Sequence, residues 1–179
     1  MSGPRQIRNI ALIGFMGTGK SSVARLLAAR LRFAILDTDE LIELQTGKSI
    51  AAIFAGEGEA AFRKYESAVV ADLASRDRAV IATGGGVGAN QAHVESLKQH
   101  ALVVCLWASP EKIWERVRHH THRPLLNDPD PLAKIRKLLA AREPIYKQAD
   151  VLLNTQMRSV KEVAQQVLHQ FRQARSPQS

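Results

Sequence analysis

Gly14-Phe15-Met16-Gly17-Thr18-Gly19-Lys20-Ser21 fills every fixed position of the pattern G-x-x-x-x-G-K-[ST]. The apolar run Ile7–Ile13 precedes this stretch, and apolar residues at helical spacing follow it in Lys20–Arg32. The context predicts a strand, a loop and a helix. Backbone N–H groups of such a loop, together with the helix N-terminus, hold the phosphates of a nucleoside triphosphate. Lys20 is expected to reach the β- and γ-phosphates, and the Ser21 hydroxyl to bind Mg²⁺.

The composition indicates one soluble domain covering residues 1–179, with a polar tail at about 175–179 that we expect to be disordered. No apolar run approaches the roughly 20 residues of a membrane span. The single cysteine, Cys105, lies in an apolar stretch, which suits a reducing cytoplasm. The net charge is +8, but the arginines are scattered and aromatic residues make up only 5% of the chain. We therefore expect the excess charge to serve anionic small molecules, with no nucleic-acid or membrane partner.

Strand-like and helix-like stretches alternate along the chain, which predicts a parallel sheet covered by helices on both faces. The expected strands are Ile7–Ile13, Ala34–Leu36, Ala79–Thr83, Ala101–Trp107 and Val151–Asn154. The expected helices are Lys20–Arg32, Gly58–Arg76, Gln91–Gln99, Pro110–His119, Leu132–Gln148 and Ser159–Ala174. Two stretches interrupt the alternation: an irregular helical one at 38–57, and a polar one at about 119–131 that we interpret as a lid, a plain surface loop being the alternative.

Unusual sequences follow three of the expected strands. The phosphate-loop motif follows the first, Asp37-Thr38-Asp39 the second, and Gly84-Gly85-Gly86 the third. Because parallel strands end at one edge of a sheet, all three should meet there. Asp37 is then a candidate for the acidic group near Mg²⁺, acting through water, and Asp39 a candidate to hold or deprotonate a substrate hydroxyl. The alternatives are a helix N-cap role for Asp39 and a plain turn for the glycines.

A small α/β chain with a phosphate loop and a lid is suited to phosphorylating a small molecule, since the lid excludes competing water. The guanine signature Asn-Lys-x-Asp is absent, which counts against a GTPase. A kinase must also neutralise charge on the moving phosphoryl group, and arginine is the usual means. Candidates are Arg123 in the expected lid, and Arg63 and Arg142 on expected helices.

Taken together, the motifs resemble those of the shikimate kinase family over about residues 9–171. They occur in the family's order: Gly14–Ser21, Leu36–Asp39, Gly47–Ile50 with Ile53-Phe54, Gly58-Glu59, Phe62-Arg63 with Glu66, Gly84–Gly86, Arg123–Leu126 and Arg142–Tyr146. The resemblance implies transfer of the ATP γ-phosphate to the 3-hydroxyl of shikimate, a step toward chorismate and aromatic amino acids. It also implies a three-layer fold with strand order 2-3-1-4-5 and a shikimate-binding subdomain at about 38–63.

By position in the resemblance, Asp39 would hold the shikimate hydroxyls and act as the base, while Arg63 and Arg142 would clamp the carboxylate. Gly84, Gly85 and Gly86 would line that pocket, with Gly85 donating its N–H. The catalytic set would be Asp39, Lys20 and Arg123.

The resemblance implies a nucleotide site in which Arg116 stacks by the adenine and Arg123 moves onto the phosphates with the lid. Mg²⁺ would lie at Ser21, with Asp37 reaching it through water. The expected ATP contacts are Gly17, Thr18, Gly19, Lys20, Ser21, Ser22, Arg116 and Arg123. Ser22 stands where the family commonly has threonine, and Gly88 where an apolar residue is expected. A monomer is expected. The rival interpretations are a kinase for another polyol acid such as gluconate and a nucleotide-binding regulator without catalysis.

Overall fold

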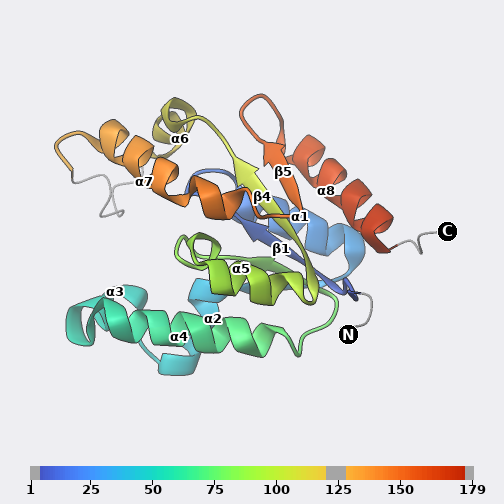
Figure 1. Ribbon diagram of the computed structural model, residues 1–179, viewed down its shortest axis with the longest axis horizontal. Helices are drawn as coiled ribbons and strands as arrows, with labels where there is room; N and C mark the ends of the chain where they lie inside the picture. The colour runs from blue at the N-terminus through green and yellow to red at the C-terminus, as the bar shows by residue number, and fades with distance from the viewer. Residues whose placement is uncertain (1–4, 120–127, 176–179) are drawn as a thin grey trace.

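The computed structural model describes residues 5–119 and 128–175 (Figure 1). In chain order the elements are β1 (Asn9–Ile13), α1 (Lys20–Leu31), β2 (Ala34–Asp37), α2 (Thr38–Thr46), α3 (Ile50–Gly56), α4 (Gly58–Leu73), β3 (Ala79–Ala82), the 3₁₀ turn η1 (Val87–Ala89), α5 (Gln91–Lys98), β4 (Ala101–Trp107), α6 (Pro110–Val117), α7 (Pro131–Tyr146), β5 (Val151–Asn154) and α8 (Val160–Arg175).

Within these ranges five parallel strands form one sheet in the order β2-β3-β1-β4-β5, which confirms the expected order. The central strand β1 pairs Ile10 with Val80 of β3 and with Leu102 of β4. All five residues of β1 are buried. Burial on both faces explains why the inner strands are continuous apolar runs with no polar alternation.

Two apolar cores lie on opposite faces of the sheet. One core joins residues such as Ala11 and Val103 to the inner sides of α4, α5 and α7. The other joins Ile10 and Leu12 to α1 and α8, where Val167 and Phe171 are buried. Adjacent strand residues thus face different helical layers, as the two-residue period of a strand requires. Figure 1 shows the sheet between α1 and α8 on one side and α4 and α5 on the other.

The irregular stretch 38–57 forms two short helices, α2 and α3, which lie against α4 at one end of the molecule (Figure 1). Phe54 of α3 packs on Phe62 of α4 with ring centroids 4.7 Å apart. Asp37 is the N-cap of α2, and its carboxylate accepts hydrogen bonds from the backbone N–H groups of Asp39 and Glu40. The alternative that Asp39 caps this helix is therefore wrong. The helix begins at Thr38, so Asp39 already lies inside its first turn.

Some helices begin or end at other residues than expected, because of their local hydrogen bonds. The helix expected to reach Arg76 ends at Leu73. The next residues bond to the carbonyl three positions back and not four, as in the bond from Ala74 N–H to Ala71 O. Pro131, placed in the expected lid, is the first residue of α7. The rest of the lid lies largely outside the described residues, as do 176–179, whereas Arg175 still belongs to α8. In the described parts of the chain, none of the helices has the length and apolar character needed to cross a membrane.

Candidate active site

A cleft of about 370 Å³ opens at the carboxyl ends of β1, β2 and β3. It brings together the three unusual sequences that follow these strands. Its lining consists of Met16, Gly17, Gly19, Lys20, Ser21, Ser22, Asp37, Asp39, Thr83, Gly84 and Gly85. The convergence expected from the strand ends is therefore found, and it places a phosphate loop opposite two carboxylates.

The phosphate loop leaves the N-terminus of α1 open to a ligand. Gly19 is the N-cap, with a φ of 94°, and no side chain caps the helix. The first N–H groups of α1 are thus available to an anion in the cleft. Lys20 reaches back over the loop, and its Nζ donates to the carbonyl oxygens of Gly14 at 2.7 Å and Phe15 at 2.8 Å. This position keeps the ammonium beside the space that phosphates would fill.

Asp39 lies in the first turn of α2 and faces the cleft, whereas Asp37 ends β2. The pKa of the Asp39 carboxyl is raised to about 6. Burial is the main cause, because it disfavours the charged form, and the negative charges of Asp37 and Glu66 add to it. The ammonium of Lys20 acts in the opposite direction. A carboxyl with this pKa is suited to taking a proton near neutral pH.

Glycine is needed at positions 84 and 86 because neighbouring side chains leave no room for a Cβ, and not because of the backbone angles. A Cβ at Gly84 would lie 2.8 Å from Cγ of Asp39, closer than real Cβ atoms come to other atoms. A Cβ at Gly86 would overlap the ion pair of Arg63 with Glu66, whose Oε2 is 3.0 Å away. The N–H of Gly84 donates to Oγ1 of Thr38 at 2.7 Å, which ties the glycines to the start of α2. Two of the three glycines thus make room for charged side chains.

Glu66 has a place in the site that the sequence interpretation did not assign. It is 1% exposed, and its Oε2 accepts from Nη1 of Arg63 at 2.7 Å. Nη2 of Arg63 donates to the exposed Glu59 at 3.0 Å, and the guanidinium lies 5.4 Å from the ring of Phe62. Arg63 is therefore held in one orientation beside Gly86, although it does not itself line the cleft. The signal in the sequence was the i, i+3 spacing of Arg63 and Glu66 on one helix.

Arg142 approaches the glycines from α7. Its Nη1 lies 3.7 Å from the position that a Cβ at Gly85 would take, and its guanidinium is 5.2 Å from the ring centroid of the buried Phe15. Arg63 and Arg142 therefore flank Gly85 and Gly86 from two different helices. Two guanidinium groups around exposed backbone N–H groups can bind a planar anion such as a carboxylate.

Arg116 of α6 lies beside the phosphate loop, where its Nη1 donates to the carbonyl oxygen of Gly17 at 3.1 Å. Arg123, the remaining candidate arginine, lies outside the described residues. For Mg²⁺, Ser21 and Asp37 line the same cleft and supply the oxygen ligands that this ion prefers. Oδ1 of Asp37 is used in capping α2, so a contact to a metal-bound water would fall to Oδ2.

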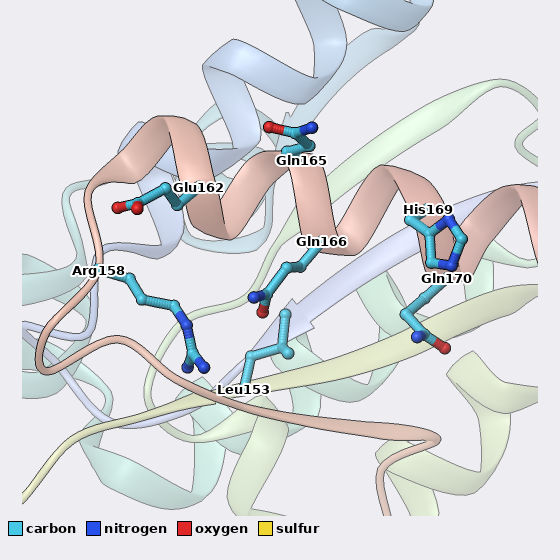
Figure 2. Close-up of a pocket in the computed structure, with 7 residues that line it drawn as sticks. All are labelled: Leu153, Arg158, Glu162, Gln165, Gln166, His169 and Gln170. Atoms are coloured by element: carbon cyan, nitrogen blue, oxygen red, sulfur yellow. The ribbon is translucent and has the colours of Figure 1, made fainter.

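A second hollow, of about 470 Å³, runs along α8 and is larger than the cleft (Figure 2). Its polar lining does not converge on one point. Figure 2 shows Gln165 on one side of α8 and Gln166 and Gln170 on the other. No residue of the phosphate loop lines it. The smaller cleft, with its phosphate loop and carboxylates and with two arginines beside its glycines, therefore remains the candidate active site.

Comparisons with known proteins agree with this geometry. Residues 16–172 match the family described as shikimate kinase. The chain is 44% identical over 168 residues to a shikimate kinase of Symbiobacterium thermophilum, covering 92% of this chain and 97% of that protein. It is 46% identical over 153 residues to a shikimate kinase of Thiobacillus denitrificans, covering 85% and 84%.

Among solved structures, shikimate kinase from Acinetobacter baumannii in complex with shikimate superposes with a TM-score of 0.86 at 38% identity, covering 94% of this chain and 95% of that one. A gluconokinase from Sinorhizobium meliloti superposes with a TM-score of 0.61 at 18% identity, covering 95% and 94%. At that identity the second likeness shows a shared fold alone.

Proposed function

The chain belongs to the shikimate kinase family, and from this premise we propose that its cleft transfers the γ-phosphate of ATP to the 3-hydroxyl of shikimate. The products are shikimate 3-phosphate and ADP, a step toward chorismate and the aromatic amino acids. One observation carries the proposal for this chain: a phosphate loop and a carboxyl with raised pKa line one cleft, and two arginines lie beside the glycines at its edge.

The acceptor is held at the glycines. Arg63 and Arg142 clamp the carboxylate of shikimate, with the N–H of Gly85 directed to the same anion. Gly84 and Gly86 keep the wall open, and the ring hydroxyls lie toward Asp39. A guanidinium already fixed by Glu66 loses little freedom when the carboxylate binds, which favours affinity.

The reaction is an in-line displacement. The 3-hydroxyl oxygen forms a bond to the γ-phosphorus, and the bond from that phosphorus to the β,γ-bridging oxygen breaks. ADP leaves with the electron pair, and the hydroxyl proton passes to Asp39. Lys20 and the loop N–H groups of Gly17, Thr18 and Gly19 balance the charge on the phosphates, so that catalysis comes mainly from positioning and electrostatics.

Mg²⁺ is the cofactor of the proposed reaction, held by the Ser21 hydroxyl and through water by Asp37. When bound, it neutralises charge shared between the β- and γ-phosphates.

Ser22 contacts the phosphates beside Ser21, and Arg116 lies by the adenine. The segment that precedes α7, from about residue 119, acts as the lid that brings Arg123 onto the phosphates, and 38–63 is the shikimate-binding subdomain. A monomer in the cytoplasm, without a nucleic-acid or membrane partner, remains a prediction.

The test is ADP formation by the purified protein with MgATP, alone and with shikimate, quinate or gluconate. We expect strong stimulation by shikimate alone. Stimulation by gluconate or quinate instead would keep the phosphate chemistry and refute the carboxylate clamp as a shikimate site. ATP binding without stimulation by any of the three would point to a regulator. Arg142→Lys should raise the KM for shikimate, because an ammonium cannot make the two-pronged contact.

A further inference from the structure

Arg116 joins the phosphate loop to the loop that follows β5. Besides its bond to Gly17 O, Nη1 donates to Oγ1 of Thr155 at 3.0 Å, and Nη2 donates to the carbonyl oxygen of Thr155 at 2.7 Å. The two bonds to Thr155 form a fork that fixes the plane of the guanidinium. Thr155 therefore sets the direction from which Arg116 approaches Gly17.

Thr155 is itself anchored to the sheet. The residue is 3% exposed, and its N–H donates to the carbonyl oxygen of Trp107 at 2.9 Å. Its hydroxyl donates to the same oxygen at 3.3 Å, which leaves the hydroxyl lone pairs to accept from Arg116. A chain of hydrogen bonds thus runs from the end of β4 through Thr155 and Arg116 to the phosphate loop.

Gly17 is the point at which this chain meets the phosphate loop. Its φ is 75°, and a Cβ there would lie 2.7 Å from Cγ1 of Val117 on α6, so no other residue fits without movement. The Gly17–Thr18 peptide is trans, so its C=O and N–H point in opposite directions. With the carbonyl held by Arg116, the N–H of Thr18 points away from the guanidinium. Backbone N–H groups of such a loop are the groups that hold phosphates.

We propose that Thr155 is a positioning residue for the nucleotide phosphates, acting through Arg116 to orient the Gly17–Thr18 peptide before a ligand arrives. The role is separate from stacking of Arg116 by the adenine, since it concerns an edge of the guanidinium and not its face. The inference rests on the proposed nucleotide site and not on the identity of the phosphoryl acceptor.

The test uses Thr155→Val, which keeps the shape of the side chain and removes the hydroxyl, beside Thr155→Ser, which restores it. The ligands are magnesium tripolyphosphate, which has no base, and MgADP, each titrated by calorimetry. Loss of one hydrogen bond to a charged group should weaken tripolyphosphate binding by about tenfold in Thr155→Val. Thr155→Ser should bind within about twofold of the wild type.

One control variant and three named outcomes complete the test. Thr46→Val removes a hydroxyl bonded to a helical carbonyl in α2 and should leave both affinities unchanged. If tripolyphosphate binds Thr155→Val as tightly as the wild type while MgADP binds more weakly, Thr155 serves only the base and the inference is wrong. If Thr155→Val does not fold, Arg116→Lys, which cannot make the fork, must show the same loss of tripolyphosphate affinity. A wild type that binds neither ligand would refute the proposed nucleotide site itself.

Discussion

The carboxylate of Asp39 occupies the space that a side chain at Gly84 would need. The proposed base and the first of the three glycines are therefore one structural unit, held together by the bond from the Gly84 N–H to Thr38. Asp39 can occupy this position only because Gly84, just after the end of β3, has no side chain.

Gly84→Ala should displace Asp39 and lower kcat/KM for shikimate by about 100-fold, the typical cost of misplacing a catalytic group by about 1 Å. The extra methyl group should also cost about 1–3 kcal/mol in the free energy of unfolding. The control is Gly56→Ala, at a helical position where a Cβ meets nothing within 4 Å. That variant should be as active as the wild type and at least as stable. Equal activity of Gly84→Ala would separate Asp39 from the reaction.

Asp39→Asn should lower kcat by roughly 10²- to 10⁴-fold, the usual contribution of a general base, with MgADP affinity little changed. The same substitution should stabilise the fold. The folded-state pKa of Asp39 is raised from 3.8 to about 6, so the folded protein binds the proton more tightly than the unfolded chain. Ionisation therefore reduces stability as pH rises from about 4 to 6.

The gain from Asp39→Asn should accordingly be full above pH 6, at up to about 2 kcal/mol after allowance for solvent screening, and should vanish near pH 4. Urea unfolding at pH 4 and pH 7.5 measures it. A variant less stable than the wild type at pH 7.5 would contradict the raised pKa.

Much of this fold follows from the sequence because the inner strands are apolar throughout. The expected bounds of Ala101–Trp107 and Val151–Asn154 agree with β4 and β5, and Gly84 to Gly86 lie beside the cleft as expected. The strand order was expected from the family resemblance. Local composition alone leaves that order open, since it depends on which apolar faces the helices cover.

The parts that local patterns could not supply depend on long-range contacts. Asp37 and Asp39 are two residues apart and chemically alike, yet one caps a helix and the other faces Gly84. From the sequence alone, Glu66 would be placed on the exposed side of an amphipathic helix. In the structure it is buried beside Gly86, because of the way α4 packs. Thr155 and Arg116 are 39 residues apart, so no spacing rule joins them.

The two glutamates that hold Arg63 provide a matched pair of substitutions. Glu66 is 1% exposed, whereas Glu59 is 68% exposed in its ion pair. Glu66→Gln removes a buried charge facing a guanidinium and should raise the KM for shikimate by at least about tenfold, since the bond to a buried charged group is worth more than about 1.4 kcal/mol. Glu59→Gln breaks a screened surface pair and should change the KM by less than about threefold.

Steady-state kinetics at saturating ATP measure both KM values, and MgADP affinity serves as the check that the nucleotide site is intact. Equal effects of the two substitutions would show that burial of Glu66 has no bearing on the orientation of Arg63.

The pH dependence of kcat/KM for shikimate should report the Asp39 carboxyl of the free enzyme. Because the base must be ionised, activity should fall about tenfold per pH unit below a midpoint near 6. The pKa of His93, the nearby imidazole at Glu66, is lowered from its ordinary value by burial. Glu66→Gln should move the midpoint to lower pH, since the charge of Glu66 is one of the causes that raise the Asp39 pKa. A midpoint unchanged by Glu66→Gln, or a profile in Asp39→Asn that retains the same acid limb, would assign the titration to another group.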